Sequence, residues 1–220
     1  MEARIHIIVG HYGSGKTEFS INYALRLKET FEKVYLVDLD IVNPYFRTND
    51  IKARLEDMGL SVIASPYASS NVDVPALPAE VNRVFADPNA AVVFDVGGDD
   101  DGAIALGRYK QFFDKEQVEM LFVINVFRPM TATAEQIQEM VFDIETVSRQ
   151  KVTALVNSSN LAGLTTASEV VKGQSIVDEA VALTGLPCRY ITATKEVAAA
   201  LPAEFEKRLF IIRRFMSTGF

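Results

Sequence analysis

A glycine-rich stretch near the start of the sequence has the residue types and spacing that bind phosphate. In VGHYGSGKTEFS, residues 9–20, Gly10 is followed after four residues by Gly15, Lys16 and Thr17. Glycines allow backbone turns that direct successive amide N–H groups into one concavity, where they can hold phosphate oxygens. The lysine would neutralise the β and γ phosphates of a nucleoside triphosphate, and the threonine hydroxyl would bind Mg²⁺. The alternative is a glycine-rich turn in which GKT occurs by chance.

Two further segments end in carboxylates that could handle the metal and a water molecule. VYLVDLD ends at Asp38 and Asp40, and AAVVFDVGG carries Asp95 followed by Gly97 and Gly98. Ligands of open α/β sheets bind at the carboxyl ends of the strands, so these acids should face the triphosphate. Asp95 would hold Mg²⁺ through a water, and the backbone N–H of Gly98 would reach the γ-phosphate. For Asp38, the alternative role is a cap on the next helix.

These residues need a scaffold, and the hydrophobic pattern predicts a parallel sheet covered by helices on both faces. Short apolar runs rich in Val and Ile alternate with longer segments of helical period, which is typical of a three-layer α/β fold with a mostly parallel sheet. We expect one domain over residues 1–220, with residues 65–78 as a loop above the ligand face. The expected strands are 4–9, 33–38, 60–65, 90–96, 119–126, 151–157 and 188–192; the expected helices are 17–30, 49–59, 131–150 and 167–185.

Composition limits the class of protein. The sequence has 220 residues, 49% of them hydrophobic, and no apolar run long enough to cross a bilayer. The first nine residues lack the features of a signal peptide, and the single cysteine excludes an internal disulfide, so we expect a cytoplasmic protein. The net charge of −7 argues against nucleic acid as a partner, because such binding depends on neutralising phosphates with Lys and Arg.

The segments GHYGSGKT, VDLDIVNP, VVFDVGG and VNSSN, in this order, resemble the MinD/ParA-type branch (CobQ/CobB/MinD/ParA) of the SIMIBI class of P-loop NTPases. The resemblance implies that the strand ending at Asp95 lies beside the strand that precedes the phosphate loop. It also implies that Asp40, 24 residues beyond Lys16, positions the attacking water, and that Asp38 fixes the waters on Mg²⁺. The implied catalytic residues are Lys16, Asp38 and Asp40, and the implied metal site is formed by Thr17, Asp38 and Asp95.

One position departs from the family pattern. Dimerising members carry a lysine directly after the first glycine of the loop, where this sequence has His11. A histidine with a pKa near 6.5 is only partly charged at neutral pH, so it is a poor substitute for a fixed cation. Either hydrolysis is slow or another group supplies the charge. Arg47 and Arg108 are candidates, with a plain surface position as the alternative for each.

The nucleotide base is expected to be adenine. The stretch VNSSN lacks the aspartate with which GTPases recognise guanine, and the amide of Asn157 can bond an adenine edge. Residues 192–197 would form the loop beside the base. The expected cofactors are ATP or ADP with Mg²⁺. The residues expected to contact the nucleotide are Gly10, His11, Tyr12, Gly13, Ser14, Gly15, Lys16, Thr17, Glu18, Gly98 and Asn157.

The favoured function is a regulatory or accessory ATPase, in which hydrolysis is coupled to a protein partner or to a nucleotide-dependent homodimer. A small-molecule kinase or ATP-dependent ligase is the alternative, with Asp40 as the base. A kinase needs an arginine-bearing lid, and the sequence shows no strong one between Asp95 and Thr131. A third reading, kept open by His11, is a nucleotide-binding module without turnover.

The C-terminal segment FEKRLFIIRRFM, residues 205–216, interleaves apolar and basic residues. Such a segment could lie on an anionic membrane, as the tails of some relatives do. We favour the more ordinary explanation, a closing helix packed on the sheet or against another subunit.

Overall fold

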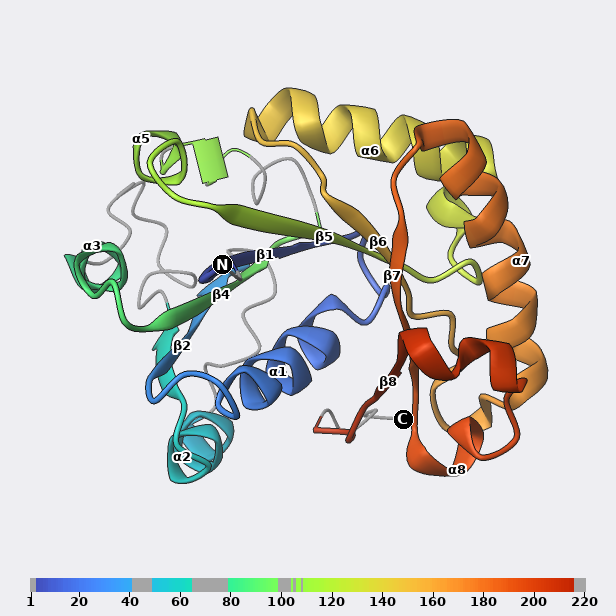
Figure 1. Ribbon diagram of the computed structural model, residues 1–220, viewed down its shortest axis with the longest axis horizontal. Coiled ribbons are helices and arrows are strands. Elements are labelled where there is room, and N and C mark those ends of the chain that lie inside the picture. The colour runs from blue at the N-terminus through green and yellow to red at the C-terminus, as the bar shows by residue number, and fades with distance from the viewer. Residues whose placement is uncertain are drawn as a thin grey trace.

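The structure is a computed structural model that describes residues 3–40, 49–64, 79–98, 104, 106–107 and 109–215. Within these residues, eight strands form one sheet with helices on both faces (Figure 1). The strands are β1 Ile5–Val9, β2 Val34–Leu39, β3 Ser61–Ala64, β4 Ala91–Val96, β5 Val118–Ile124, β6 Ala154–Asn157, β7 Cys188–Ala193 and β8 Leu209–Ile211. The α-helices are α1 Lys16–Leu27, α2 Asn49–Asp57, α3 Ala79–Ala86, α5 Lys110–Phe113, α6 Ala134–Ser148, α7 Ala167–Thr184 and α8 Lys195–Ala198, and the 3-10 helices are η2 Pro129–Thr131, η3 Ala162–Leu164 and η4 Ala203–Arg208.

The strand order is β3-β2-β4-β1-β5-β6-β7-β8, and every described pair is parallel. This confirms the predicted three-layer α/β class. Strand β1 lies between β4 and β5, so the loop after β1 is flanked by the loops that follow both neighbours. The prediction that the Asp95 strand lies beside the phosphate-loop strand is confirmed, because β4 pairs directly with β1.

Two hydrophobic cores fill the space on either side of the sheet. One contains Phe19 of α1 and Leu55 of α2, so these two helices cover the same face (Figure 1). The other contains Val84 of α3, Ile137 of α6 and Val177 of α7. The central strands β1 and β4 are buried along their whole length, as expected for parallel strands covered on both sides.

The C-terminal segment differs from the predicted closing helix. Residues 203–208 form η4, and residues 209–211 form β8, which extends the sheet beside β7. Asn22 of α1 then exchanges two hydrogen bonds with the backbone of Arg213, at 2.8 and 2.9 Å. Short alternation of apolar and polar residues suits an edge strand as well as a helix, and pairing with β7 decides between them.

Several predictions concern segments that the structure does not describe. The expected loop at 65–78, Arg47 and Arg108 all lie outside the described residues. Among the described residues, no helix has both the length and the apolar character that a membrane span requires.

Candidate nucleotide site

The phosphate loop joins the end of β1 to the start of α1. Gly13 and Gly15 have φ angles of 75° and 88°, in the left-handed region that favours glycine. Gly15 is the N-cap of α1 and provides no side-chain hydrogen bond. By contrast, α6, α7 and α8 begin at Thr133, Thr166 and Thr194, each of which accepts a bond from its own first turn. No side chain at the N-cap of α1 therefore competes with a phosphate oxygen for the helix start.

Lys16, the first residue of α1, points into the interior and is only 5% exposed. Its Nζ lies 3.6 Å from Oδ2 of Asp40, a carboxylate that is also buried. The backbone N–H of Asp40 donates to Oδ1 of Asp38 at 2.9 Å, which fixes the chain as it leaves β2. The three residues implied in catalysis are thus brought together at the carboxyl ends of β1 and β2.

Asp95 lies directly beneath the start of α1. It is 1% exposed, and its Oδ1 accepts a 3.0 Å hydrogen bond from the Ser20 hydroxyl. Burial raises the pKa of Asp95 to about 6, although Lys16 and the hydroxyls of Thr17 and Ser20 act to lower it. Asp95 and Asp38 are register partners on β4 and β2, so their side chains share one face of the sheet. The Thr17 hydroxyl also bonds to Asp95, so the three residues that the sequence predicts as a Mg²⁺ site lie at the ends of β2 and β4 and at the start of α1.

The other residues expected to contact the nucleotide differ in burial and in hydrogen bonding. Burial, followed by the charges of Lys16 and Arg128, lowers the pKa of His11, so this side chain is mainly neutral at pH 7. Tyr12 is 67% exposed, whereas the Ser14 hydroxyl is buried with no hydrogen-bond partner among the described residues. The carboxylate of Glu18 accepts a bond from the backbone N–H of Phe215 at 2.6 Å, which attaches the C-terminal segment to α1.

Gly98 packs against the backbone of the phosphate loop. A Cβ atom at this position would lie 2.7 Å from the Tyr12 nitrogen and 2.9 Å from the Gly10 oxygen. Both distances are shorter than real Cβ contacts allow, and backbone atoms cannot rotate away. The chain after β4 is therefore in direct contact with the loop after β1.

We expect Gly98→Ala to weaken nucleotide affinity by about tenfold or more, because the added methyl group displaces the loop backbone. Isothermal titration calorimetry with MgATP measures this loss. Gly107→Ala is the matched control, since among the residues that the structure describes its Cβ would meet only the Val147 oxygen, at 3.9 Å. Equal affinities for the two variants would show that the loop tolerates the displacement.

Asn157 is placed differently from the expectation. Its side chain is fully buried, and its Nδ2 donates to the Val170 oxygen and to Oε1 of Gln174, at 3.3 and 3.1 Å. Its Oδ1 accepts the backbone N–H of Ser159 at 3.0 Å. Nδ2 thus joins the end of β6 to α7, and Oδ1 holds the start of the loop after β6. In this arrangement the hydrogen bonds of the Asn157 amide stabilise the packing of the β6 end against α7.

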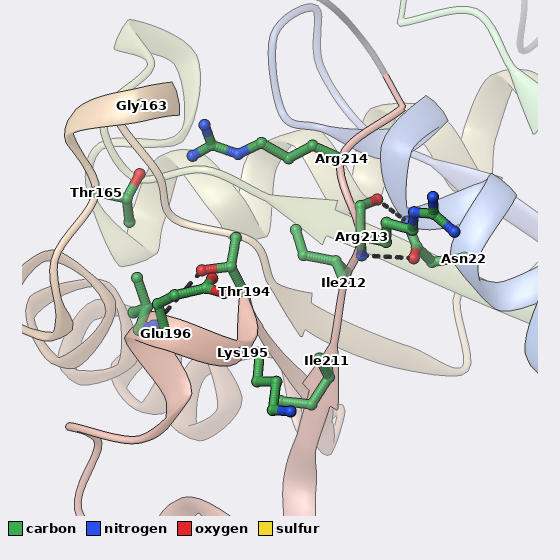
Figure 2. Close-up of a pocket in the computed structure, with 11 residues that line it drawn as sticks. Asn22, Gly163, Thr165, Thr194, Lys195, Glu196, Ile211, Ile212, Arg213 and Arg214 are labelled. Atoms are coloured by element: carbon green, nitrogen blue, oxygen red, sulfur yellow. Dashed lines mark hydrogen bonds between the residues drawn. The ribbon is translucent and has the colours of Figure 1, made fainter.

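A pocket of about 640 Å³ opens beside α1, where the loops after β6 and β7 meet the C-terminal segment (Figure 2). Thr194 and Glu196 lie on one side of the pocket, and Arg214 crosses the other side toward Gly163. The guanidinium of Arg214 donates to the Ala162 oxygen. The pocket therefore includes part of the 192–197 segment that the sequence placed beside the base. Its lining residues are Asn22, Gly163, Thr165, Thr194, Lys195, Glu196, Val197, Ile211, Ile212, Arg213 and Arg214.

The loop after β5 also contacts the phosphate loop, and sequence reasoning missed it. Asn125 is fully buried, and its Nδ2 donates to the Gly13 oxygen at 3.3 Å. Arg128 donates to the same oxygen at 3.1 Å. No local pattern in the sequence marks them, because they reach the phosphate loop only through the strand order, in which β5 pairs with β1 and its carboxyl end lies beside the loop.

Solved structures of FtsY proteins share this fold. The cell division protein FtsY of Thermotoga maritima superposes with a TM-score of 0.58 at 19% identity, covering 98% of this chain and 66% of that chain. For chloroplast FtsY of Physcomitrella patens the TM-score is 0.58 at 16% identity, with 86% of this chain and 58% of that chain covered. The fold is that of a P-loop NTPase.

The signal recognition particle receptor FtsY of Elizabethkingia anophelis in complex with GDP has the same P-loop NTPase fold, with a TM-score of 0.53 at 17% identity. That match covers 98% of this chain and 61% of the receptor. The chain thus spans 58% to 66% of the length of these neighbours. No protein-family model matches the sequence, and no curated protein matches it significantly. The SIMIBI class is consistent with this fold, whereas the MinD/ParA branch within it rests on the sequence motifs alone.

Proposed function

We propose that this P-loop protein binds a nucleoside triphosphate with Mg²⁺ and hydrolyses it. The observation that carries the proposal is the convergence of Lys16, Asp40 and Asp95 on a helix start that has no side-chain cap. The fit is chemical as well as geometric. A helix start without a side-chain cap and a buried ammonium suit phosphate oxygens, and a buried carboxylate beside the Thr17 hydroxyl suits Mg²⁺.

The residues of the chain would act in a defined order. Lys16 leaves Asp40 and pairs with the β and γ phosphates, because a polyanion attracts the ammonium more strongly than one carboxylate does. Asp40 is then available to accept a hydrogen bond from the attacking water and to orient it. Thr17 and Asp95 would hold Mg²⁺, with Asp38 fixing its waters. When bound, Mg²⁺ offsets the charge that develops on the phosphate oxygens.

The pocket beside α1 is our proposed site for the base and the ribose. Its volume of about 640 Å³ is within the range of small-molecule sites. Because Asn157 is committed to α7, recognition of the base would come from the pocket itself, where Thr194, Lys195 and Glu196 offer both donors and acceptors. We retain ATP as the proposed substrate, because VNSSN lacks an acidic partner for guanine. One structural neighbour was solved with GDP, so GTP is the necessary comparison.

We further propose a regulatory or accessory role of the MinD/ParA type, in which nucleotide state controls binding to a protein partner or to a second copy of the chain. Its support is the order of the four motifs in the sequence. In the tertiary structure, the loops after β4 and β5 both contact the phosphate loop, so ligand-dependent changes there can reach the surrounding surface.

The test is phosphate release from ATP and from GTP with Mg²⁺, combined with the mass in solution with ADP and with a non-hydrolysable ATP analogue. We expect turnover that is faster with ATP, and a larger mass only with the analogue. Asp40→Asn should slow turnover about a hundredfold or more and leave binding nearly unchanged, because it removes a base and no phosphate ligand.

Binding without release of phosphate by the wild-type protein would overturn hydrolysis and favour a binding module or a kinase that lacks its acceptor. A constant mass in both nucleotides would overturn the homodimer. Unchanged turnover in Asp40→Asn would show that another acidic residue orients the attacking water.

A further inference from the structure

The loop between β5 and η2 holds the phosphate loop through one carbonyl group. Nδ2 of Asn125 donates to the Gly13 oxygen at 3.3 Å and to the Asn160 oxygen at 3.1 Å. Its Oδ1 accepts the backbone N–H groups of Phe127 and Asn160, at 3.1 and 3.3 Å. Every polar atom of this buried amide is therefore used, and its orientation is fixed.

Arg128 adds a charged donor to the same carbonyl. Its backbone N–H donates to the Asn125 oxygen at 3.0 Å, and its Nε donates to the Gly13 oxygen at 3.1 Å. The guanidinium lies close against Gly13, because a Cβ atom there would be 2.7 Å from Nε and 3.1 Å from Cζ. Arg128 is exposed to solvent as a whole, but its guanidinium contacts the phosphate loop at Gly13.

The contact fixes the shape of the loop. The Gly13 carbonyl and the Ser14 N–H belong to one peptide group, and that N–H donates to the His11 oxygen at 3.0 Å. Because a peptide group is planar, two donors on its oxygen also hold the orientation of its N–H. The turn from His11 to Ser14 is therefore held from outside the loop.

The charge of Arg128 is permanent, whereas that of His11 is not. A guanidinium remains protonated at all working pH values, and His11 is mainly neutral at pH 7. The fixed charge that the sequence lacks at position 11 thus has a source in the same chain, on the β5–η2 loop.

We propose that Arg128 is a positioning residue for phosphoryl transfer, which holds the Gly13 carbonyl and supplies in cis the fixed positive charge that position 11 lacks. This inference rests on the proposed nucleotide site. Negative charge on the departing phosphate oxygens grows in the transition state, so a nearby fixed cation lowers the barrier more than it strengthens ground-state binding.

Steady-state hydrolysis of MgATP by Arg128→Gln and Arg128→Lys tests this role. We expect Arg128→Gln to lower kcat about ten- to a hundredfold while KM changes less than about threefold, as for the loss of one charge-assisted hydrogen bond. Arg128→Lys keeps the charge and should recover part of kcat. Arg83→Gln, which removes the same charge from an exposed position on α3, is the matched control and should leave both constants unchanged.

Proton NMR gives a readout that does not depend on turnover. The sequence has only two histidines, so the His11 resonance can be followed through a pH titration. Two cations act on this ring, Lys16 from α1 and Arg128 from the β5–η2 loop. Arg128→Gln should raise the pKa of His11 toward its ordinary value, and Arg128→Lys should leave it nearly unchanged.

Unchanged kcat together with an unchanged His11 titration in Arg128→Gln would overturn the proposal. A raised pKa of His11 with unchanged kcat would also overturn it, because the charge would then be present without serving the reaction. If the wild-type protein binds MgATP but does not hydrolyse it, the proposed hydrolysis fails. The positioning role is then judged by the His11 titration alone, and an unchanged titration in Arg128→Gln would overturn it as well.

Discussion

Replacing Lys16 by alanine is expected to reduce affinity for MgATP by about a hundredfold or more. Lys16 is the buried first residue of α1, and its Nζ lies 3.6 Å from Oδ2 of Asp40, so its ammonium already lies among the buried carboxylates of the proposed phosphate site. Without it, a bound triphosphate would meet the carboxylates of Asp40 and Asp95 without the ammonium that offsets their charge. Titration of the variant with a fluorescent ATP analogue in the presence of Mg²⁺ measures the effect.

The same substitution leaves Asp40 buried without its cation, so a loss of folding must be separated from a loss of binding. The double variant Lys16→Ala/Asp40→Asn removes the ammonium and the carboxylate charge together, so the buried site does not gain a net negative charge. We expect it to melt near the wild-type temperature and still to bind MgATP about a hundredfold or more weakly than the wild type. A folded double variant with wild-type affinity would show that the glycine-rich loop is only a structural turn.

Asp95→Asn is expected to stabilise the ligand-free protein at neutral pH. In the folded state the pKa of Asp95 is about 6, above the ordinary value of 3.8. Well below pH 3.8 the carboxyl is protonated in both states and has no effect on stability. As pH rises from 4 to 6 the unfolded chain releases this proton first, so folding becomes less favourable, by roughly 3 kcal/mol once pH exceeds 6. Asparagine has no proton to release and avoids this loss.

Denaturant unfolding of the wild type and Asp95→Asn at pH 4 and pH 7 measures the gain. The difference between the two proteins should be small at pH 4 and favour the variant at pH 7. Asparagine can still accept the Ser20 hydrogen bond, so the packing beneath α1 is preserved. A variant less stable than the wild type at pH 7 would contradict the expectation and show that Lys16 and the two hydroxyls more than offset the burial.

The same variant should lose Mg²⁺-dependent turnover, by about a hundredfold or more, because a neutral amide is a weak partner for a metal-bound water. Phosphate release measured across a Mg²⁺ series checks this. Stability and activity would then change in opposite directions at one residue. Such a trade-off is typical of a buried charge that is retained for function.

Much of the site could be predicted from the sequence because its signals are local. The spacing of Gly10, Gly15, Lys16 and Thr17 places a phosphate loop between a strand and a helix, and the apolar runs before Asp38 and Asp95 indicate strand ends. Seven of the eight described strands follow from their Val- and Ile-rich composition. Each of these inferences depends on residues within a few positions of one another, where backbone preference and periodicity act directly.

The remaining features depend on contacts between distant segments, which only the tertiary structure decided. The position of β5 beside β1 brings Arg128 to Gly13, a contact between residues 115 positions apart in the chain. Packing of the β6 end against α7 engages the amide of Asn157 in hydrogen bonds to Val170 and Gln174. Pairing with β7 makes the C-terminal segment a strand. Strand order and burial arise from the free energy of the whole packed core, so no local pattern specifies which distant side chain completes the site.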